Sequence, residues 1–148
     1  MDHAVDEDTR LVLRRTYAAP VAAVYAAWTE PEQMKHWMGP SDDYTSEVTS
    51  DLRVGGRYRI VMRGDGVETH RVGGAFEEVV PNRKLVYTWA WESTPDRVSR
   101  VTVEFLPHGQ GTELLLTHER FTDRDARDRH QQGWLGCLPR LDRYLSLN

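Results

Sequence analysis

The stretch APVAAVYAAWTEPE, residues 19–32, decides how this chain is expected to fold. Pro20 suits the first position of a helix, because its missing N–H would have no partner there. After it, apolar side chains recur at the spacing of one helical face. They are Val21, Val24, Tyr25 and Trp28. The stretch therefore predicts a short amphipathic helix over about 20–28.

The end of the same stretch predicts a second short helix over about 30–37. Thr29 and Glu32 stand at the spacing of a capping box, with Pro31 in the first turn. Trp37 closes this helix just before Gly39-Pro40, a pair that stops helices. Trp37 is therefore expected at the rim of the folded domain.

Strand signals lie on both sides of the two helices. Residues 9–18 precede them as a strand, and six strands follow them, the first over 44–50. In RYRIVMR, residues 57–63, apolar and arginine side chains alternate, which indicates one buried and one wet face. Gly73-Gly74 predicts a bulge or a sharp bend in the next strand, over 69–80. Residues 84–91 then place Leu85, Tyr87, Trp89 and Trp91 on one face.

A long helix closes the chain. Thr122 and Asp125 form a capping pattern of the Thr-x-x-acid type at its start. At 100° per residue, one side of this helix is mostly apolar. That side carries His130, Trp134, Cys137, Leu138, Leu141, Tyr144 and Leu145.

These elements have one economical packing, an α+β domain. A curved antiparallel sheet wraps around the long C-terminal helix, with the two short helices between strands one and two. A sheet curved in this way leaves room for a cavity against the helix. The chain has 148 residues, which suits one domain over 9–148, and the acidic residues 1–8 are expected to be a disordered leader.

Composition excludes several classes of function. The net charge of −4 argues against nucleic acid as the main partner. No apolar run approaches the ~20 residues of a membrane span, and residues 1–8 do not resemble a signal peptide. The single cysteine, Cys137, fits the reducing cytoplasm. The arginines alternate with acids along the strands, which predicts an ion-paired outer sheet face.

The order of these motifs resembles a known family, the bacterial proteins similar to activator of Hsp90 ATPase. This family belongs to the START/Bet v 1-like (SRPBCC) superfamily of helix-grip folds. The segments that carry the resemblance span roughly residues 10–147. They are residues 19–32, Trp37 with Gly39-Pro40, DLRVGG (51–56), GAFEEVVP (74–81), RKLVYTW (83–89), Gly111-Thr112 with Leu114, Leu116 and Thr117-His118, and Gly133-Trp134.

The resemblance implies a helix-grip fold whose cavity commonly takes small hydrophobic molecules. Some relatives are enzymes, such as aromatic polyketide cyclases. The sequence does not contain the Asn-rich, Trp-His-Trp motif of the eukaryotic co-chaperones, so a chaperone role does not follow from the fold. We expect non-covalent binding of a hydrophobic, aromatic or lipid-like molecule between the sheet and the last helix.

The predicted ligand-binding residues are those expected on inward faces around this cavity. They are Trp37, Tyr58, Ile60, Met62, Trp89, Trp91, His118, Trp134, Leu138 and Leu141. His118 follows Leu114 and Leu116 on one strand face, so it is a core histidine or a polar anchor for a ligand. His130 belongs to the cavity mouth or to the surface. No metal and no cofactor are expected, because the histidines lack the spacing of a metal site.

Two alternatives to simple binding remain open. One is an enzyme of the cyclase or hydrolase type that uses an inward histidine or glutamate, with Glu78 as the candidate glutamate. Cys137 is expected to act as a small buried hydrophobe rather than as a nucleophile. The other alternative is a chaperone-related interaction domain. A long exposed sheet edge would also suit a homodimer.

Overall fold

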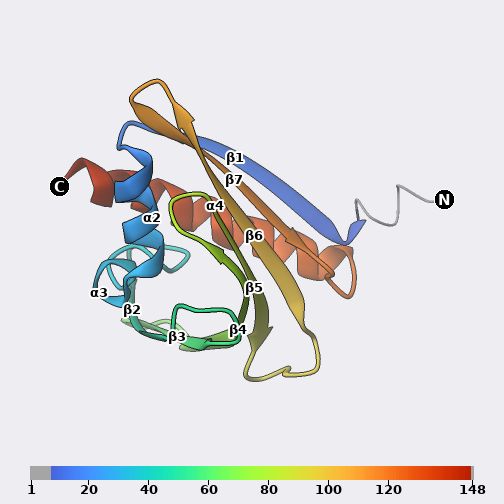
Figure 1. Ribbon diagram of the computed structural model, residues 1–148. Coiled ribbons are helices and arrows are strands. Elements are labelled where there is room, and N and C mark those ends of the chain that lie inside the picture. Colours follow the sequence, from blue (N-terminus) through green and yellow to red (C-terminus); the bar gives the residue numbers. More distant parts are fainter. Residues whose placement is uncertain (1–7, 148) are drawn as a thin grey trace.

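A curled antiparallel sheet wraps around one long helix in the computed structural model, which describes residues 8–147 (Figure 1). The elements in chain order are β1 (Arg10–Tyr17), α2 (Val21–Thr29), α3 (Pro31–Met34), β2 (Tyr44–Ser50), β3 (Arg57–Gly64), β4 (His70–Val80), β5 (Lys84–Trp91), β6 (Ser99–His108), β7 (Gly111–Glu119) and α4 (Arg124–Ser146). The predicted α+β helix-grip architecture is confirmed. Apart from Asp8, the predicted leader lies outside the described residues.

The sheet has seven strands in the order β1-β7-β6-β5-β4-β3-β2, and every neighbouring pair is antiparallel. The chain runs from β2 to β7 as a meander, and β1 then pairs with β7. α2 and α3 lie near the C-terminal end of α4 (Figure 1). This path brings β5 and its tryptophans over the first half of α4, where the candidate site forms.

The bulge predicted at Gly73-Gly74 is not where the sheet becomes irregular. Gly73 pairs regularly with Ala90 of β5, and the register shift lies between Phe76 and Glu78. Glycine is needed at position 74 for a different reason. A Cβ atom there would lie 2.1 Å from the carbonyl oxygen of Thr88, so only a residue without a side chain fits.

The two short helices begin differently from the predicted pattern. Pro20 is the N-cap of α2, with φ −68° and ψ 159°, rather than its first helical residue. Thr29 ends α2, and its hydroxyl donates to the carbonyl of Tyr25 at 2.8 Å. It therefore does not cap α3, whose N-cap is Glu30 and whose first residue is Pro31. The predicted capping box is wrong, because the Thr29 hydroxyl bonds backward into its own helix.

Four of the seven side chains on the predicted inward face of α4 are buried and the other three are half-buried. The cap of this helix lies one residue later than predicted. Asp123, not Thr122, is the N-cap, and its carboxylate accepts from the backbone N–H of Ala126 at 2.8 Å. Leu138 and Leu141 have no exposed surface. The Tyr17 hydroxyl of β1 donates to the carbonyl of Leu138 at 3.1 Å, which ties the helix to the far edge of the sheet.

The outer face of the sheet is ion-paired, as predicted. Arg59 of β3 lies 2.6 Å from the carboxylate of Glu92, and Arg63 lies 2.8 Å from that of Glu47. Such exposed pairs stabilise a fold only weakly, so their main effect is solubility. Among the helices of the described residues, none is long and apolar enough to cross a membrane.

Candidate functional site

A cavity of about 420 Å³ lies between the sheet and the first half of α4. Its walls come from β3, β5, α4 and the loop that precedes β2. The lining residues are Met38, Gly39, Pro40, Met62, Trp89, Trp91, Arg129, His130, Gln132, Gly133, Trp134 and Cys137. Six of these twelve residues carry an indole, thioether or thiol group, and the polar ones lie on α4. An apolar cavity with a few polar groups is typical of a small-molecule site.

Three indole rings from two elements form the apolar wall. Trp89 and Trp91 lie two residues apart on β5, so both face the helix. Their ring centroids are 5.5 Å apart with an interplanar angle of 87°. Trp134 of α4 lies 5.5 Å from Trp89, ring centroid to ring centroid. The first contact is edge-to-face and the second is tilted at 44°, and together they hold the three rings in fixed orientations, which preforms the wall.

His118 supports this wall from behind. The indole N–H of Trp134 donates to His118 Nδ1 at 3.0 Å, which leaves the ring proton on Nε2. His118 Nε2 lies 2.7 Å from the hydroxyl of Ser99, and that hydroxyl donates to the carbonyl of Trp89 at 3.2 Å. Both ring nitrogens are thus used, and His118 has no exposed surface. It orients two tryptophans rather than facing the cavity.

His130 holds the third tryptophan in a similar way. Its Nδ1 lies 2.6 Å from the carbonyl of Ala126, one turn earlier in α4, and donates its proton there. Its Nε2 therefore accepts the indole N–H of Trp91 at 2.8 Å. His130 is half-buried and lines the cavity, so of the two positions left open by the sequence it occupies the cavity and not the surface.

Burial lowers the pKa of both histidines. For His118 the shift is large, and the neighbouring His130 adds to it; for His130, the charge of Arg129 adds to the effect of burial. Each ring accepts an indole N–H only while it is neutral, because an imidazolium ion has no acceptor. Protonation would therefore break the bond to Trp134 or to Trp91.

The protein is consequently expected to lose stability in mild acid. In the unfolded chain these histidines titrate near 6.5, whereas in the folded protein they resist protonation to lower pH. The contribution of the two histidines to the free energy of unfolding is fully present above a pH of about 6.5. It falls as the pH drops below that value, by up to about 1.4 kcal/mol per histidine per pH unit. Urea unfolding at several pH values from 7.5 to 5 measures this slope, the pH values being chosen to bracket about 6.5.

The variant His118→Gln tests the origin of this slope. Glutamine offers an acceptor and a donor but does not titrate, so the slope below pH 6.5 should become smaller. His108→Gln, at an exposed position of β6, is the matched control and should keep the wild-type slope. An equal slope in the wild type and in His118→Gln would contradict the assignment.

One buried hydrogen-bond donor near the cavity, the indole N–H of Trp89, has no acceptor among the described residues. It is also inaccessible to solvent. An unpaired buried N–H costs about 1–3 kcal/mol, so such groups are rare in folded proteins. The ring of Trp89 lines the cavity, but its N–H is turned into the protein and has no surface that a ligand there could reach.

The structure brings four of the ten predicted ligand-binding residues to the cavity: Met62, Trp89, Trp91 and Trp134. Tyr58 and Ile60 line a separate cavity of about 20 Å³, too small for more than one water molecule. The remaining four are buried in the core: Trp37, His118, Leu138 and Leu141. Trp37 is not at the rim, because its indole N–H donates to the carbonyl of Ala27 at 3.0 Å and its ring packs on Trp28.

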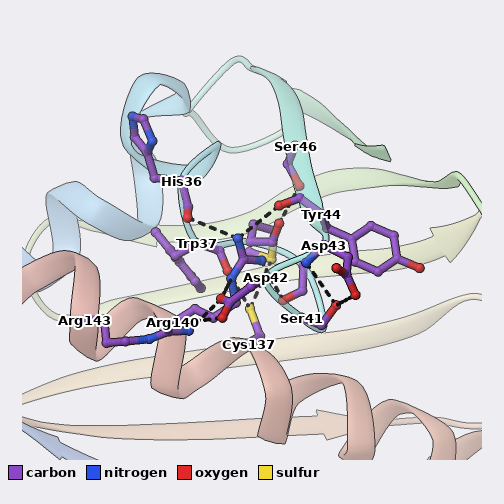
Figure 2. A network of polar contacts seen from close by, with 12 residues as sticks. His36, Trp37, Ser41, Asp42, Asp43, Tyr44, Ser46, Cys137, Arg140 and Arg143 are labelled. Atoms are coloured by element: carbon purple, nitrogen blue, oxygen red, sulfur yellow. Dashed lines mark hydrogen bonds and ion pairs between the residues drawn. The ribbon is translucent and has the colours of Figure 1, made fainter. Parts of the chain in front are cut away.

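One rim of the cavity is a loop clamped to α4 by Arg140 (Figure 2). The guanidinium donates to the carbonyls of Gly39 at 3.1 Å, His36 at 3.3 Å and Tyr44 at 3.0 Å. Asp42 lies 3.3 Å from Arg140 Nε and completes the network. The Arg140 side chain is only 9% exposed. The loop from residue 35 to 43 is therefore held by one buried arginine.

Other side chains satisfy the carbonyls that Arg140 does not reach. The thiol of Cys137 donates to the carbonyl of Trp37 at 3.5 Å, and the hydroxyl of Ser46 donates to that of Met38. Every carbonyl from residue 36 to 39 thus has a side-chain donor. This accounts for the burial of Cys137, which raises the pKa of its thiol to about 12. The prediction that Cys137 is an inert buried group agrees with this environment.

Glu78, the candidate catalytic glutamate, does not point inward. Its side chain is 46% exposed and lies 3.6 Å from the ammonium group of Lys84. The register shift after Phe76 changes the parity of the strand, so the face inferred from Phe76 does not hold at Glu78. This expectation is corrected.

Sequence reasoning missed Arg129, Gly133 and Arg140. Arg140 lies three residues after Cys137, next to the apolar face, and that spacing is the one available signal for its burial. Gly133 lines the cavity, and a Cβ atom there would meet nothing within 4 Å. It therefore leaves free space in the wall, next to Trp134.

Comparison with known proteins agrees with this architecture. The family model described as "Activator of Hsp90 ATPase homolog 1-like protein" matches residues 18–146. Among curated proteins, no sequence matches the chain at a significant level. Solved structures of similar shape are numerous, and three of them illustrate the likeness.

Protein NE0264 from Nitrosomonas europaea is 26% identical, with a TM-score of 0.82 and 97% of each chain covered. Protein CV1439 from Chromobacterium violaceum is 26% identical, with a TM-score of 0.79, and the match covers 90% of this chain and 94% of that one. The AHSA1-like protein from Aeromonas hydrophila is 25% identical, with a TM-score of 0.79 and coverages of 93% and 92%. With the family model matching nearly the whole folded region, the chain belongs to the Activator of Hsp90 ATPase homolog 1-like family of helix-grip proteins.

Proposed function

We propose that this protein binds a small hydrophobic molecule, aromatic or lipid-like, in the cavity between the sheet and α4. The observation that carries the proposal is the cavity itself, about 420 Å³ in volume and walled by the indoles of Trp89, Trp91 and Trp134. Burial of apolar ligand surface there would contribute ~25 cal/mol per Å². The polar side chains that line the cavity from α4, Arg129 and Gln132, would orient the ligand.

The two remaining alternatives have less support. The inward His118 uses both ring nitrogens inside the core, and Glu78 is exposed, so neither is placed to act on a molecule in the cavity. An interaction domain would need a contiguous apolar surface. The exposed apolar residues lie instead on separate elements, such as Val12 on β1, Leu106 on β6 and Leu135 on α4.

A cytoplasmic location is part of the proposal. The only cysteine, Cys137, is a free thiol that donates to the carbonyl of Trp37. A fold that uses its thiol in this way suits a reducing compartment.

Filling the cavity tests the proposal. A Cβ atom at position 133 meets nothing within 4 Å, so Gly133→Phe should place its ring in the space beside Trp134 and weaken binding of a neutral aromatic probe at least tenfold. The probe is N-phenylnaphthylamine, whose emission rises when it enters an apolar site. Binding is measured by fluorescence titration, and folding by circular dichroism.

The matched control is Gly133→Ala, which adds one methyl group at the same position. It should leave probe affinity within about twofold while stabilising α4 slightly, because glycine is a poor helix former. If the wild type does not bind the probe, or if folded Gly133→Phe binds it as tightly as the wild type, the proposal fails.

A further inference from the structure

A second cavity of about 240 Å³ adjoins the first. Trp89, Trp91, Arg129 and His130 line both cavities, so the two cavities adjoin at these residues. The second cavity extends toward the segment between β5 and β6 and the segment between β7 and α4. It is more polar than the first, with the side chains of Ser93, Thr94 and Thr122 in its lining.

Three arginines surround the second cavity without an acid among the lining residues. They are Arg97, Arg120 and Arg129, from three different segments of the chain. In the part of the chain that the structure describes, none of the three makes an ion pair. Other arginines, such as Arg59 and Arg63 on the outer sheet face, are paired with glutamates. The lining of the second cavity therefore carries positive charge that no acid of the same lining compensates.

The backbone at Arg120 supports a role for its side chain. Arg120 has φ 69°, in the left-handed region that glycine and asparagine adopt most readily. Holding an arginine in this conformation costs roughly 1 kcal/mol. Glycine would remove that cost, so an arginine here is kept against the preference of the backbone.

We propose that the ligand is an amphipathic anion, with a carboxylate, sulfonate or phosphate head group. This inference rests on the proposed binding function and extends it. The apolar body lies in the tryptophan-lined cavity, and the head group lies in the second cavity, beside Arg97 and Arg120. Arg129, which lines both cavities, contacts the ligand where body and head group join. Arginine suits such a head group because its planar guanidinium can donate two parallel hydrogen bonds to one anion.

Two dyes with the same ring system test the charge requirement. N-phenylnaphthylamine is neutral, and anilinonaphthalenesulfonate adds one sulfonate to the same rings. The wild type should bind the sulfonate more tightly than the neutral dye. Arg97→Gln and Arg120→Gln should each weaken sulfonate binding about tenfold and leave the neutral dye within about twofold. Fluorescence titration at fixed ionic strength gives all of these constants.

Arg83→Gln is the matched control for bulk charge. Arg83 is exposed in the turn between β4 and β5, away from both cavities, so its replacement should change neither affinity. Arg120→Gly separates a role of Arg120 in binding from a role in stability. It should lower sulfonate affinity while the melting temperature stays equal or rises, because glycine relieves the backbone at this position.

The outcomes separate the two proposals. If the neutral dye binds and the cavity variants remove it, but the arginine variants leave the sulfonate affinity unchanged, the anion proposal is overturned and the binding proposal stands. If Arg83→Gln lowers sulfonate affinity as much as Arg97→Gln does, general surface charge accounts for binding, and the anion site is again overturned. If neither dye binds, both proposals fail.

Discussion

Replacing Arg140 by alanine is expected to lower the free energy of unfolding by about 3 kcal/mol or more. The guanidinium donates to the carbonyls of His36, Gly39 and Tyr44, and hydrogen bonds from a charged donor are each worth about 1.5–3 kcal/mol. With alanine at position 140, these three carbonyls lose their donor while α4 still covers them. Partial hydration of the freed carbonyls keeps the loss below the full sum. Urea unfolding followed by circular dichroism measures the effect.

Arg143→Ala is the matched control for this variant. Arg143 lies one turn further along α4, and its guanidinium reaches the same Asp42, at 2.7 Å. Both side chains of that pair are more than half exposed, so the control should cost at most about 1 kcal/mol. Equal losses for Arg140→Ala and Arg143→Ala would show that Arg140 acts only through Asp42. The clamp on the loop would then be contradicted.

The clamp also explains which parts of the fold could be predicted from the sequence. Trp134, Leu138 and Leu141 repeat along one helical face, and their burial depends only on that face meeting the sheet. The burial of Arg140 depends instead on loop carbonyls about a hundred residues earlier. No local pattern encodes that contact. Read alone, a charged side chain beside an apolar face indicates a solvated edge.

Errors in the caps and at the bulge have a different cause. Thr29 has the sequence context of an N-cap, but its hydroxyl donates to the carbonyl of Tyr25 in the preceding turn of its own helix. Gly74 has the sequence context of a bulge or a sharp bend, whereas the structure needs glycine because the Thr88 carbonyl of the next strand lies against it. The sequence marks both positions as unusual. The reason in each case is a contact with a neighbour that sequence spacing does not select.

The candidate site also contains residues that the sequence could place and residues that it could not. Trp89 and Trp91 could be assigned to the inner face of β5, because alternation along one strand fixes their side. The arginines of the second cavity come from the segments after β5, after β7 and at the start of α4, and only the tertiary fold brings them together. Along the sequence they could not be told apart from the paired arginines of the outer face.

Replacing Gly136 by alanine is expected to lower the free energy of unfolding by about 2 kcal/mol, although alanine is the better helix former. A Cβ atom at position 136 would lie 2.0 Å from the carbonyl oxygen of Pro40. That oxygen belongs to the backbone, so the loop over residues 38–40 has to move away from α4. Any such movement also works against the hydrogen bond from Arg140 to Gly39. The cost of displacing the loop therefore exceeds the gain in helix propensity of about 1 kcal/mol.

Gly133→Ala makes the comparison decisive, because it changes the same residue type one turn earlier in the same helix. Its Cβ atom would meet nothing within 4 Å, so only the helix propensity changes and stability should rise by up to about 1 kcal/mol. The two substitutions should thus shift the urea midpoint in opposite directions. The loop over 38–40 is one wall of the cavity, so Gly136→Ala should also weaken binding of N-phenylnaphthylamine, whereas Gly133→Ala should not. If both substitutions shift the urea midpoint in the same direction, the loop moves away from the added methyl group at little cost. The contacts of Arg140 and Gly136 would then not make this rim of the cavity rigid.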